Sequence, residues 1–307
     1  MVALLFPGQG SQFVGMGRDL AERFPAARAA FEEADAALGL SLTRLMWEGP
    51  EEELTLTLNA QPAILAHSVA VARVLADRLG DVAYAAGHSL GEFSAYVVAG
   101  SLAYGDALQT VRRRGELMFR GGQERPGAMA ALLGLDDEVV ERVCREASAV
   151  GSECVPANYN SPAQVVISGD VPAVERAMEL AKAAGAKRAL RLNVSGAFHS
   201  PLMAVAEAGL EARLAEVDLA EPRFPVVSNV TAAPVAERGE ARRLLVRQLT
   251  SPVRWTGSMR FLVGAGVTRF LELGPGNVLA GLLKRVSREV EVRSIGTADE
   301  AEAFLNP

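Results

Sequence analysis

The amino-acid sequence predicts an α/β protein with a mainly parallel sheet and a smaller subdomain inserted into it. The first observation is a pair of short apolar runs, residues 2–6 and 82–86, each followed at once by a glycine-rich turn. A strand, a sharp turn and a helix in close succession are typical of α/β organisation. The second observation is a change of pattern within residues 127–194, where the elements follow the order β-α-β-β-α-β. That order is the split-βαβ or ferredoxin-like pattern, and its place in mid-chain indicates an insertion.

The individual elements follow from the spacing of apolar residues and from turn signals. In the first part we expect strands at 2–6 and 82–86, and helices at 59–79 and 93–98. In the inserted part we expect strands at 128–133, 154–159, 164–168 and 187–194, and helices at 136–149 and 171–184. After it we expect strands at 224–230 and 267–273, and helices at 201–216, 240–249 and 278–285. The predicted domains are a large part, residues 1–124 and 197–307, and a ferredoxin-like small part, residues 125–196.

Length and composition restrict the class of protein. The chain has 307 residues, half of them apolar, and a formal net charge of −6 at pH 7, which argues against a nucleic-acid binder. Two cysteines, Cys144 and Cys154, make neither a disulfide framework nor a metal cluster, so we expect reduced thiols in the cytoplasm and no metal site. The N-terminal run has no basic start and is too short to cross a membrane, so no membrane attachment is expected.

Ser89 is the candidate nucleophile. The segment Gly87-His88-Ser89-Leu90-Gly91 matches the pattern G-x-S-x-G between a predicted strand and a predicted helix. Glycines on both sides let the chain bend sharply, and the bend exposes the hydroxyl at the carboxyl end of the sheet. It also aims the backbone N–H of Leu90 at a developing oxyanion. The alternative interpretation is an ordinary strand-to-helix turn.

His199 is the candidate base, because the other two histidines have structural explanations. His88 adjoins the serine on a turn where neighbouring side chains diverge, and His67 lies in an apolar helix, as a core histidine would. His199 follows the inserted part, and the order Ser then His is that of α/β-hydrolase-like enzymes, the core fold that we expect. Asp218 and Glu272 are candidates for a third member by position alone, and a backbone carbonyl or an amide is the alternative. The sequence therefore predicts a dyad.

The glycine-rich segment at residues 8–15 has two possible uses. A dinucleotide-binding G-x-G-x-x-G would need its third glycine where Phe13 stands, so that interpretation fails. A loop at a strand end can instead supply a second oxyanion donor, here the backbone N–H of Gln9. One such donor is worth on the order of a hundred- to a thousandfold in rate.

Together these motifs resemble the malonyl-CoA:acyl-carrier-protein transacylase family over nearly the whole chain. Any one motif is weak, whereas all of them in order are specific. The matching stretches are Phe6-Pro-Gly-Gln-Gly-Ser-Gln12, Gln61-Pro62, Gly87-His-Ser-Leu-Gly-Glu92, Arg114-Gly115 with Met118, Asn158-Tyr-Asn-Ser-Pro162, Gly196-Ala-Phe-His-Ser-Pro201, Gln248, Pro252-Val-Arg-Trp255 and Leu273-Gly-Pro-Gly276.

The resemblance implies a role for the residues that carry out the chemistry. Ser89 would be the nucleophile and His199 its base. The backbone N–H groups of Gln9 and Leu90 would form the oxyanion hole. The main chain near Gln248 would orient the histidine, in agreement with the lack of an obvious acid.

The resemblance also implies a set of substrate-binding residues. Arg114 would hold the free carboxylate of malonate, because a guanidinium stays charged and binds a carboxylate through two parallel hydrogen bonds. Its choice among three consecutive arginines depends on the glycine that follows it. Gln61, Met118 and Asn160 would also contact substrate. The bulk of Phe198 favours unbranched malonyl over methylmalonyl.

The implied reaction is ping-pong transfer of malonyl from a coenzyme A thioester to an acyl carrier protein, in fatty acid or polyketide synthesis. No metal or redox cofactor is expected, and the protein is expected to be a monomer. The carrier is expected to be acidic, which makes two basic clusters candidate docking charges. These clusters are Lys187 with Arg188 and Arg191, and Lys284 with Arg285.

Three other functions fit the same motifs. A serine hydrolase or thioesterase would share Ser89 and His199 but release free malonate to water. A catalytically idle scaffold of a larger synthase would retain no malonyl group. A transferase for other acyl groups would lose malonyl and acetyl transfer equally when Arg114 is replaced.

Overall fold

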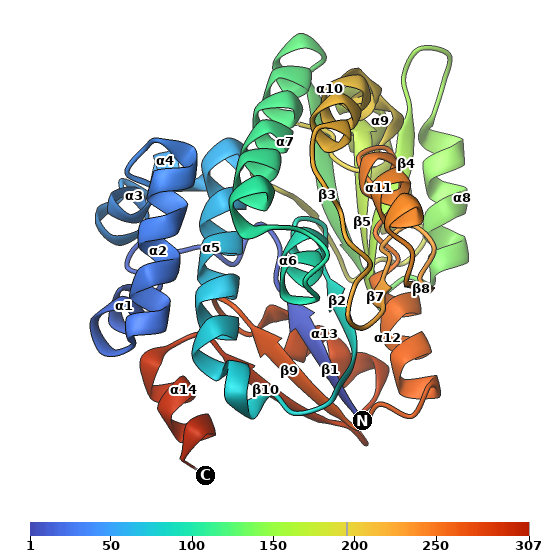
Figure 1. The fold of residues 1–307 in the computed structure, drawn as a ribbon. Helices are drawn as coiled ribbons and strands as arrows, with labels where there is room; N and C mark the ends of the chain where they lie inside the picture. The colour runs from blue at the N-terminus through green and yellow to red at the C-terminus, as the bar shows by residue number, and fades with distance from the viewer. Residues whose placement is uncertain (195, 307) are drawn as a thin grey trace.

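The computed structural model describes residues 1–194 and 196–306, which form two sheets with helices packed around them (Figure 1). The larger sheet has the strand order β10-β9-β1-β2-β7-β8, and its neighbouring strands are parallel except β7 and β8. Its strands are β1 (Val2–Phe6), β2 (Val82–Gly87), β7 (Val226–Val227), β8 (Pro234–Val235), β9 (Arg269–Leu273) and β10 (Glu291–Ile295). The predicted α/β class with a mainly parallel sheet is confirmed.

The smaller sheet is antiparallel and has the order β4-β5-β3-β6. Its elements follow the chain order β-α-β-β-α-β, with α8 and α9 packed on one another and on the sheet around a separate apolar core. The elements are β3 (Gly127–Leu133), α8 (Asp137–Ala147), β4 (Cys154–Ser161), β5 (Gln164–Asp170), α9 (Val171–Ala183) and β6 (Arg188–Arg191). The turn between β4 and β5 is shorter than predicted, because only residues 162–163 lie outside the two strands, and Ala163 adopts φ of 59°.

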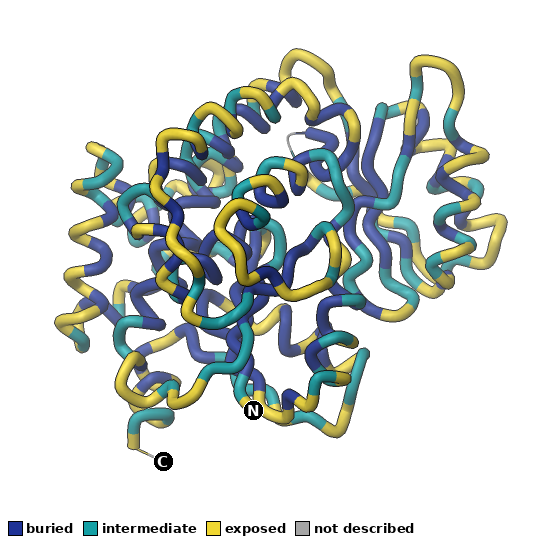
Figure 2. Tube along the Cα trace, turned by 45° about the vertical axis from the view of Figure 1, so that its right-hand side comes forward, coloured by how far each residue is buried: buried dark blue, intermediate teal, exposed yellow. Residues whose placement is uncertain are grey.

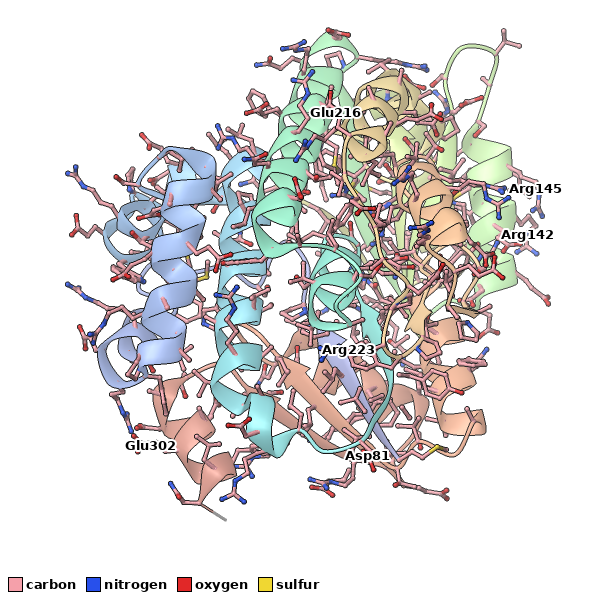
Figure 3. The ribbon with its side chains drawn as sticks, viewed as in Figure 1. Asp81, Arg142, Arg145, Glu216, Arg223 and Glu302 are labelled. Atoms are coloured by element: carbon pink, nitrogen blue, oxygen red, sulfur yellow. The ribbon has the colours of Figure 1, made fainter. Side chains whose placement is uncertain are left out.

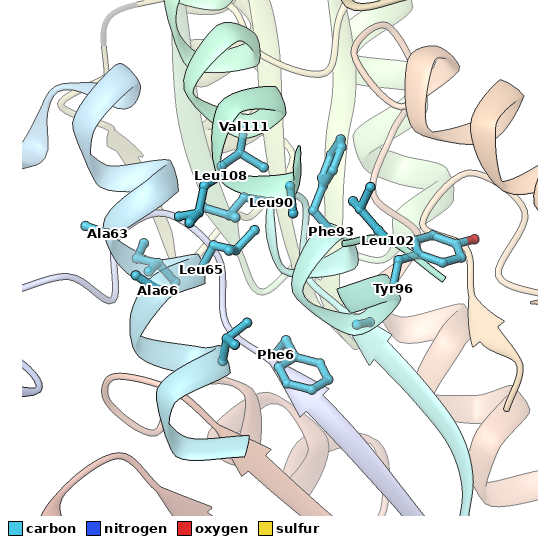
Figure 4. Packing of buried hydrophobic residues seen from close by; sticks show 14 of the residues in the cluster. Phe6, Ala63, Leu65, Ala66, Leu90, Phe93, Tyr96, Leu102, Leu108 and Val111 are labelled. Atoms are coloured by element: carbon cyan, nitrogen blue, oxygen red, sulfur yellow. The ribbon is translucent and has the colours of Figure 1, made fainter. Parts of the chain in front are cut away.

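Strand β1 shows why the larger sheet needs helices on both faces. Successive side chains of a strand point to opposite faces, and Leu4 and Phe6 enter one core while Ala3 and Leu5 enter another. Helices α5 (Thr57–Leu75), α6 (Gly91–Val98) and α7 (Tyr104–Glu124) cover the first face (Figure 4). Helices α12 (Trp255–Gly264) and α13 (Val278–Val286) cover the second. The uninterrupted apolar run of β1 is what a strand buried on both faces requires.

Several predicted elements differ in extent from those observed. The strand expected at 224–230 is reduced to β7, because the chain turns at Ser228, whose N–H donates to Ala233 O at 3.0 Å. The helix expected at 201–216 is a 3₁₀ turn, η2 (Pro201–Met203), followed by α10 (Ala204–Ala215). The helix expected at 59–79 ends at Leu75 and continues as η1 (Ala76–Arg78). The helix expected at 240–249 is α11 (Arg238–Arg247).

Other elements had no individual prediction from the sequence. They are α7, α12, β8, β10, α1 (Arg18–Arg23), α2 (Pro25–Leu38), α3 (Leu42–Glu48), α4 (Glu51–Thr55) and α14 (Ala298–Leu305). Figure 1 shows α1 to α4 stacked beside α5, with α14 and the C-terminus near α1. The predicted small part ends at residue 196, and Ser195 within it lies outside the described residues.

A short backbone ladder ties β4 of the smaller sheet to the segment just before α12. The N–H of Tyr159 on β4 donates to Val253 O at 2.9 Å, and the N–H of Val253 donates to Ala157 O at 2.8 Å. The chain trace is mostly buried along β1, β5 and β9 and exposed on the outer faces of the helices (Figure 2). Charged side chains such as Asp81, Arg142 and Glu302 project outward from the ribbon (Figure 3). Within the described ranges, no helix combines the length and apolar character needed to cross a membrane.

Candidate active site

The turn that carries Ser89 is fixed by steric necessity. Ser89 has φ of 51°, a conformation rarely adopted by non-glycine residues, and it links β2 to α6. A Cβ on Gly87 would lie 1.9 Å from the carbonyl of Gly91, and a Cβ on Gly91 would lie 2.1 Å from Phe6 O. Both glycines of the predicted motif are therefore required for the turn to pass between β1 and α6.

Asn229 holds this strained turn from outside the motif. Its side-chain Oδ1 accepts from the N–H of Ser89 at 2.7 Å, and its Nδ2 donates to Gly87 O at 2.7 Å. Asn229 is fully buried in the bend that follows β7. Sequence reasoning missed this residue, because a single asparagine in an expected strand carries no recognisable signal.

His199 lies beside the serine. Its Nε2 is 2.8 Å from Ser89 Oγ, and its Nδ1 is 2.9 Å from Gln248 O. A carbonyl can only accept, so Nδ1 carries the hydrogen and the Nε2 lone pair faces the hydroxyl. Burial, with a contribution from the Arg114 cation, lowers the pKa of His199 to about 3, which keeps the imidazole neutral. The structure thus brings together the two residues that the sequence proposed as a dyad.

The remaining candidates for base and acid occupy other places. His67 is fully buried within α5, and its two ring nitrogens have no hydrogen-bond partner in the described part of the chain. Glu272 accepts from the N–H groups of Leu279 and Ala280 at the start of α13. Because the Nδ1 of the catalytic candidate histidine bonds to a backbone carbonyl, neither Asp218 nor Glu272 serves as its acid.

Arg114 is buried in the site, with only 1% of its surface exposed. Its Nη2 donates to Ser89 Oγ at 3.1 Å and to Gln248 Oε1 at 2.8 Å, and its Nη1 donates to Gln61 Oε1 at 2.7 Å. Burial lowers the pKa of Arg114 to about 10, so the guanidinium remains charged at neutral pH. A cation thus lies directly beside the candidate nucleophile.

Gly115, the residue after Arg114, explains how the arginine side chain reaches the site. A Cβ on Gly115 would lie 2.6 Å from Leu58 Cα, so the absence of a side chain lets α7 approach the start of α5 closely. The two preceding arginines do not enter the site. Arg112 and Arg113 instead form ion pairs with Glu116, where all three side chains are partly exposed.

A one-directional chain of hydrogen bonds connects Arg114 to the glycine-rich loop. Gln61 accepts from the arginine, its Nε2 donates to Thr57 Oγ1 at 3.0 Å, and Thr57 Oγ1 donates to Gln9 Oε1 at 2.7 Å. In the described part of the chain, the backbone N–H groups of Gln9 and Leu90 donate to no protein acceptor. Both residues line the same cavity as Ser89, and their N–H groups are the ones that the sequence proposed for an oxyanion hole.

The side chain of Gln248 links the site to a buried acid. Its Nε2 donates to Glu92 Oε2 at 2.7 Å and to Ser89 O at 3.0 Å. The N–H of Asn229 also donates to Glu92 Oε2, at 3.1 Å. Glu92 is fully buried, and burial raises its pKa to about 7. In the sequence analysis, Glu92 was included in the nucleophile motif but was given no role. Its position at the start of α6, directly after the motif turn, was the signal that could have drawn attention to it.

A cavity of about 190 Å³ lies between the two sheets and is bordered by Ser89. Nine of the ten site residues predicted from the sequence line it, and Gln248 lies behind it. The lining residues are Gln9, Gln61, His88, Ser89, Leu90, Arg114, Met118, Met129, Asn158, Asn160, Val166, Leu192, Val194, Phe198 and His199. His88, expected to be structural, borders the cavity, and its Nε2 bonds to Asn160 Oδ1 at 2.8 Å.

Such an arrangement suits acyl transfer, because a serine paired with a neutral imidazole can attack a carbonyl and form an acyl-enzyme. Residues 3–302 match the family model described as "Acyl transferase domain". The chain belongs to this acyl transferase family.

Individual relatives are more specific. The chain is 47% identical over 304 residues to the "Malonyl CoA-acyl carrier protein transacylase" of Bacillus subtilis (strain 168), covering 99% of this chain and 96% of that protein. A crystal structure of an acyl carrier protein S-malonyltransferase from Vibrio cholerae is similar, with a TM-score of 0.94 and 44% identity. The match covers 98% of this chain and 99% of that chain. A malonyl-transacylase solved in complex with a type II PKS acyl-carrier protein is also similar, with a TM-score of 0.95 and 45% identity. The match covers 99% of this chain and 98% of that chain.

Proposed function

We propose that this chain transfers a malonyl group from coenzyme A to the phosphopantetheine thiol of an acyl carrier protein, in fatty acid or polyketide synthesis. The names of the relatives support this substrate and this acceptor. The observation that carries the proposal is the buried Arg114, whose Nη2 lies 3.1 Å from Ser89 Oγ. A fixed cation beside the nucleophile suits an acyl group that ends in a carboxylate, whereas a plain esterase has no need of it.

In the first half-reaction, His199 Nε2 accepts the hydroxyl proton of Ser89 as the serine oxygen attacks the malonyl thioester. The negative charge that develops on the carbonyl oxygen accepts hydrogen bonds from the backbone N–H groups of Gln9 and Leu90. The thioester C–S bond breaks, the proton on His199 passes to the sulfur, and coenzyme A leaves as malonyl-Ser89 forms. The Nδ1–H bond to the backbone carbonyl of Gln248 keeps the imidazole in the required tautomer.

In the second half-reaction, the thiol of the carrier's phosphopantetheine replaces coenzyme A. His199 removes the thiol proton, the sulfur attacks the malonyl ester, and the proton returns to the oxygen of Ser89. Throughout, the malonyl carboxylate is held by Arg114, with Gln61, Met118, Asn160 and Phe198 forming the walls of the cavity. The two half-reactions share one cavity, which is the requirement for ping-pong transfer.

The proposal includes no metal or redox cofactor, because every step is a proton transfer or an acyl transfer, and malonyl-CoA is a substrate. We assign the protein to the cytoplasm as a monomer. We also assign the larger sheet to an α/β-hydrolase-like core, residues 1–124 and 197–307, and the small sheet to a ferredoxin-like subdomain, residues 125–196. The strand orders of the two sheets support these assignments.

The carrier protein is expected to be acidic, so two basic clusters are candidate docking charges. One cluster is Lys187, Arg188 and Arg191 on and beside β6, and the other is Lys284 and Arg285 near the end of α13. Charge reversal in the cluster that docks the carrier, whichever of the two it is, is expected to slow transfer to the carrier, and more so at low salt. Malonyl loading from coenzyme A would be the internal control, and an unchanged salt dependence of carrier transfer would exclude the cluster.

The proposed function is tested by following the malonyl group itself. Incubation with malonyl-CoA should add one malonyl group to the protein, detected by intact-mass spectrometry and absent in Ser89→Ala. Addition of holo-carrier protein should then remove the group and yield malonyl-carrier. Release of free malonate instead would identify a hydrolase, and failure to acquire any acyl group would identify a catalytically idle protein.

A further inference from the structure

The site holds two buried charges of opposite sign that are separated by a single amide. Arg114 Nη2 donates to Gln248 Oε1 at 2.8 Å, and Gln248 Nε2 donates to Glu92 Oε2 at 2.7 Å. Glu92 has no exposed surface and Arg114 has 1%. Because the imidazole of His199 is neutral, these two groups balance one another within the site.

The surroundings of Glu92 contain no second cation within the described residues. Helix α6 packs against α5, α7, β1, β2 and β7, and Arg114 of α7 is the charged group that acts on the carboxylate. Gln248 and Asn229 approach it as neutral donors to Oε2, and the neutral hydroxyl of Ser228 also lies near the carboxylate. Tyr96 on its own helix is buried, and burial raises the pKa of its hydroxyl, so it stays neutral too. The other oxygen, Oε1, is buried without a hydrogen-bond partner in the same residues.

A malonyl carboxylate would disturb this balance. It carries a full negative charge and competes with Glu92 for the field of one guanidinium. Two carboxylates that share one buried cation cannot both remain ionised cheaply, and protonating one of them is the usual resolution. The malonyl group is held directly by the guanidinium, whereas Glu92 is held only through an amide, so Glu92 is the weaker competitor.

We propose that Glu92 is the charge-balancing acid of this site and takes up a proton from solvent when a malonyl carboxylate pairs with Arg114. The inference rests on the proposed function. The proton is added to Oε1, the oxygen with no donor, so the hydrogen bonds to Oε2 are retained. Burial already raises the pKa of Glu92 to about 7, so a modest further rise suffices at neutral pH. Glu92 would act as a positioning residue, because it keeps the Gln248 amide oriented in both charge states.

The experiment counts protons during acyl loading. A weakly buffered solution at about pH 8 with a pH indicator receives excess malonyl-CoA, and intact-mass spectrometry gives the malonyl groups bound to Ser89. We expect an uptake of between about 0.5 and 1 proton per malonyl group. The serine proton leaves on coenzyme A, so acyl transfer itself consumes none. Loading with acetyl-CoA releases the same thiol and is expected to show no uptake beyond the thiol's own ionisation.

Two variants locate the acid. Glu92→Gln is expected to reduce the uptake at least about fivefold per malonyl group loaded. Glu272→Gln is the matched control, because Glu272 is also fully buried and accepts three hydrogen bonds, but outside the cavity. The proton uptake of Glu272→Gln per malonyl group is expected to match that of the parent protein.

Two results would overturn the inference: malonyl loading by the parent with no proton uptake, or equal uptake by Glu92→Gln. Should Glu92→Gln fail to fold, infrared difference spectra of the parent and of Glu272→Gln decide, since a protonated-carboxyl band must appear on malonyl loading. Absence of that band also overturns it. If no malonyl group is loaded at all, the proposed function fails instead.

Discussion

The two walls of the cavity differ in polarity: one is polar and hydrogen-bonded, and the other is mostly apolar. The wall from the larger sheet and its helices carries Ser89 and the buried side chains of His199 and Arg114, and both of these side chains contact the serine hydroxyl. The wall from the small sheet and the segment after it is mostly apolar. Its members are Met129, Asn158, Asn160, Val166, Leu192 and Val194. The candidate catalytic groups thus lie on one wall, and the other wall is mainly apolar.

The two walls also differ in how much backbone strain they have to hold in place. Ser89 and His199 both have positive φ, at 51° and 56°, and such strain persists only where surrounding contacts over-determine it. The larger part supplies those contacts through Asn229 and Gln248. On the small-sheet side, Asn160 provides a hydrogen bond across the cavity, to His88. Variants on the first wall should therefore change rates far more than variants on the second.

The largest effect is expected for Ser89→Ala. Removal of the hydroxyl leaves no group to carry the malonyl, so transfer should fall by at least about a thousandfold and no acyl-enzyme should form. The measurement is malonyl transfer to holo-carrier protein together with intact mass. A residual rate within tenfold of the parent would mean that the polar wall does not hold the nucleophile.

The next largest effect is expected for Arg114→Ala. Loss of a buried charge-assisted pair should slow malonyl transfer by about 10²- to 10³-fold, and acetyl transfer, which has no carboxylate to bind, by less than about tenfold. The measurement is kcat/KM for both thioesters. Arg113→Ala is the matched control, because that neighbouring arginine pairs with Glu116 on the exposed side of α7. Equal losses for the two thioesters would exclude carboxylate recognition.

These two residues also show how far sequence reasoning reaches. Ser89 was predictable because close contacts require the glycines beside it, those of Gly87 with the start of α6 and those of Gly91 with Phe6 of β1. Arg114 was identified through the resemblance and the following glycine. The dyad followed by elimination, since only three histidines exist. Where close packing leaves a short motif such as G-x-S-x-G in the sequence, the motif is sufficient to locate the residue.

The remaining features depend on distant pairs that no local pattern marks. Asn229 bonds to a residue 140 positions away, and Thr57 to one 48 positions away. Glu92 stands next to the motif, but its importance depends on an amide 156 positions along the chain. Strand prediction had a similar limit: β2 was predicted from its apolar run and turn, whereas β7 was predicted too long because the chain turns at Ser228, which the apolar pattern does not mark.

The pH dependence tests the electrostatics of the polar wall. Burial lowers the pKa of His199 to about 3, below the ordinary 6.5, so the neutral base persists as pH falls. The rate of acyl-enzyme formation at saturating malonyl-CoA should therefore stay level between about pH 7.5 and 5.5, measured by rapid quench. A histidine with the ordinary pKa would lose about tenfold by pH 5.5. Such a loss would mean that the imidazole is not desolvated.

A smaller effect is expected for Thr57→Val, which removes the hydroxyl between Gln61 and Gln9 without changing volume. The lost pair of hydrogen bonds should lower kcat for malonyl transfer about five- to tenfold, and Thr57→Ser should restore most of it. Thr110→Val is the matched control, because Thr110 is fully buried and its hydroxyl has no partner in the described residues. Similar losses for the two valine variants would reduce Thr57 to a packing role.

The smallest effect is expected on the wall of the small sheet, for Asn160→Ala. Its amide accepts from or donates to His88 Nε2 at 2.8 Å, and the loss of one such bond should slow transfer only about two- to fivefold, mainly through KM. Tyr159→Phe is the control, because it removes a bond to Glu141 within the small part, and it should leave transfer unchanged. A loss for Asn160→Ala as large as that for Arg114→Ala would erase the distinction between the walls. It would place part of the chemistry on β4, since an alanine there leaves the dyad and its tautomer-fixing carbonyl untouched.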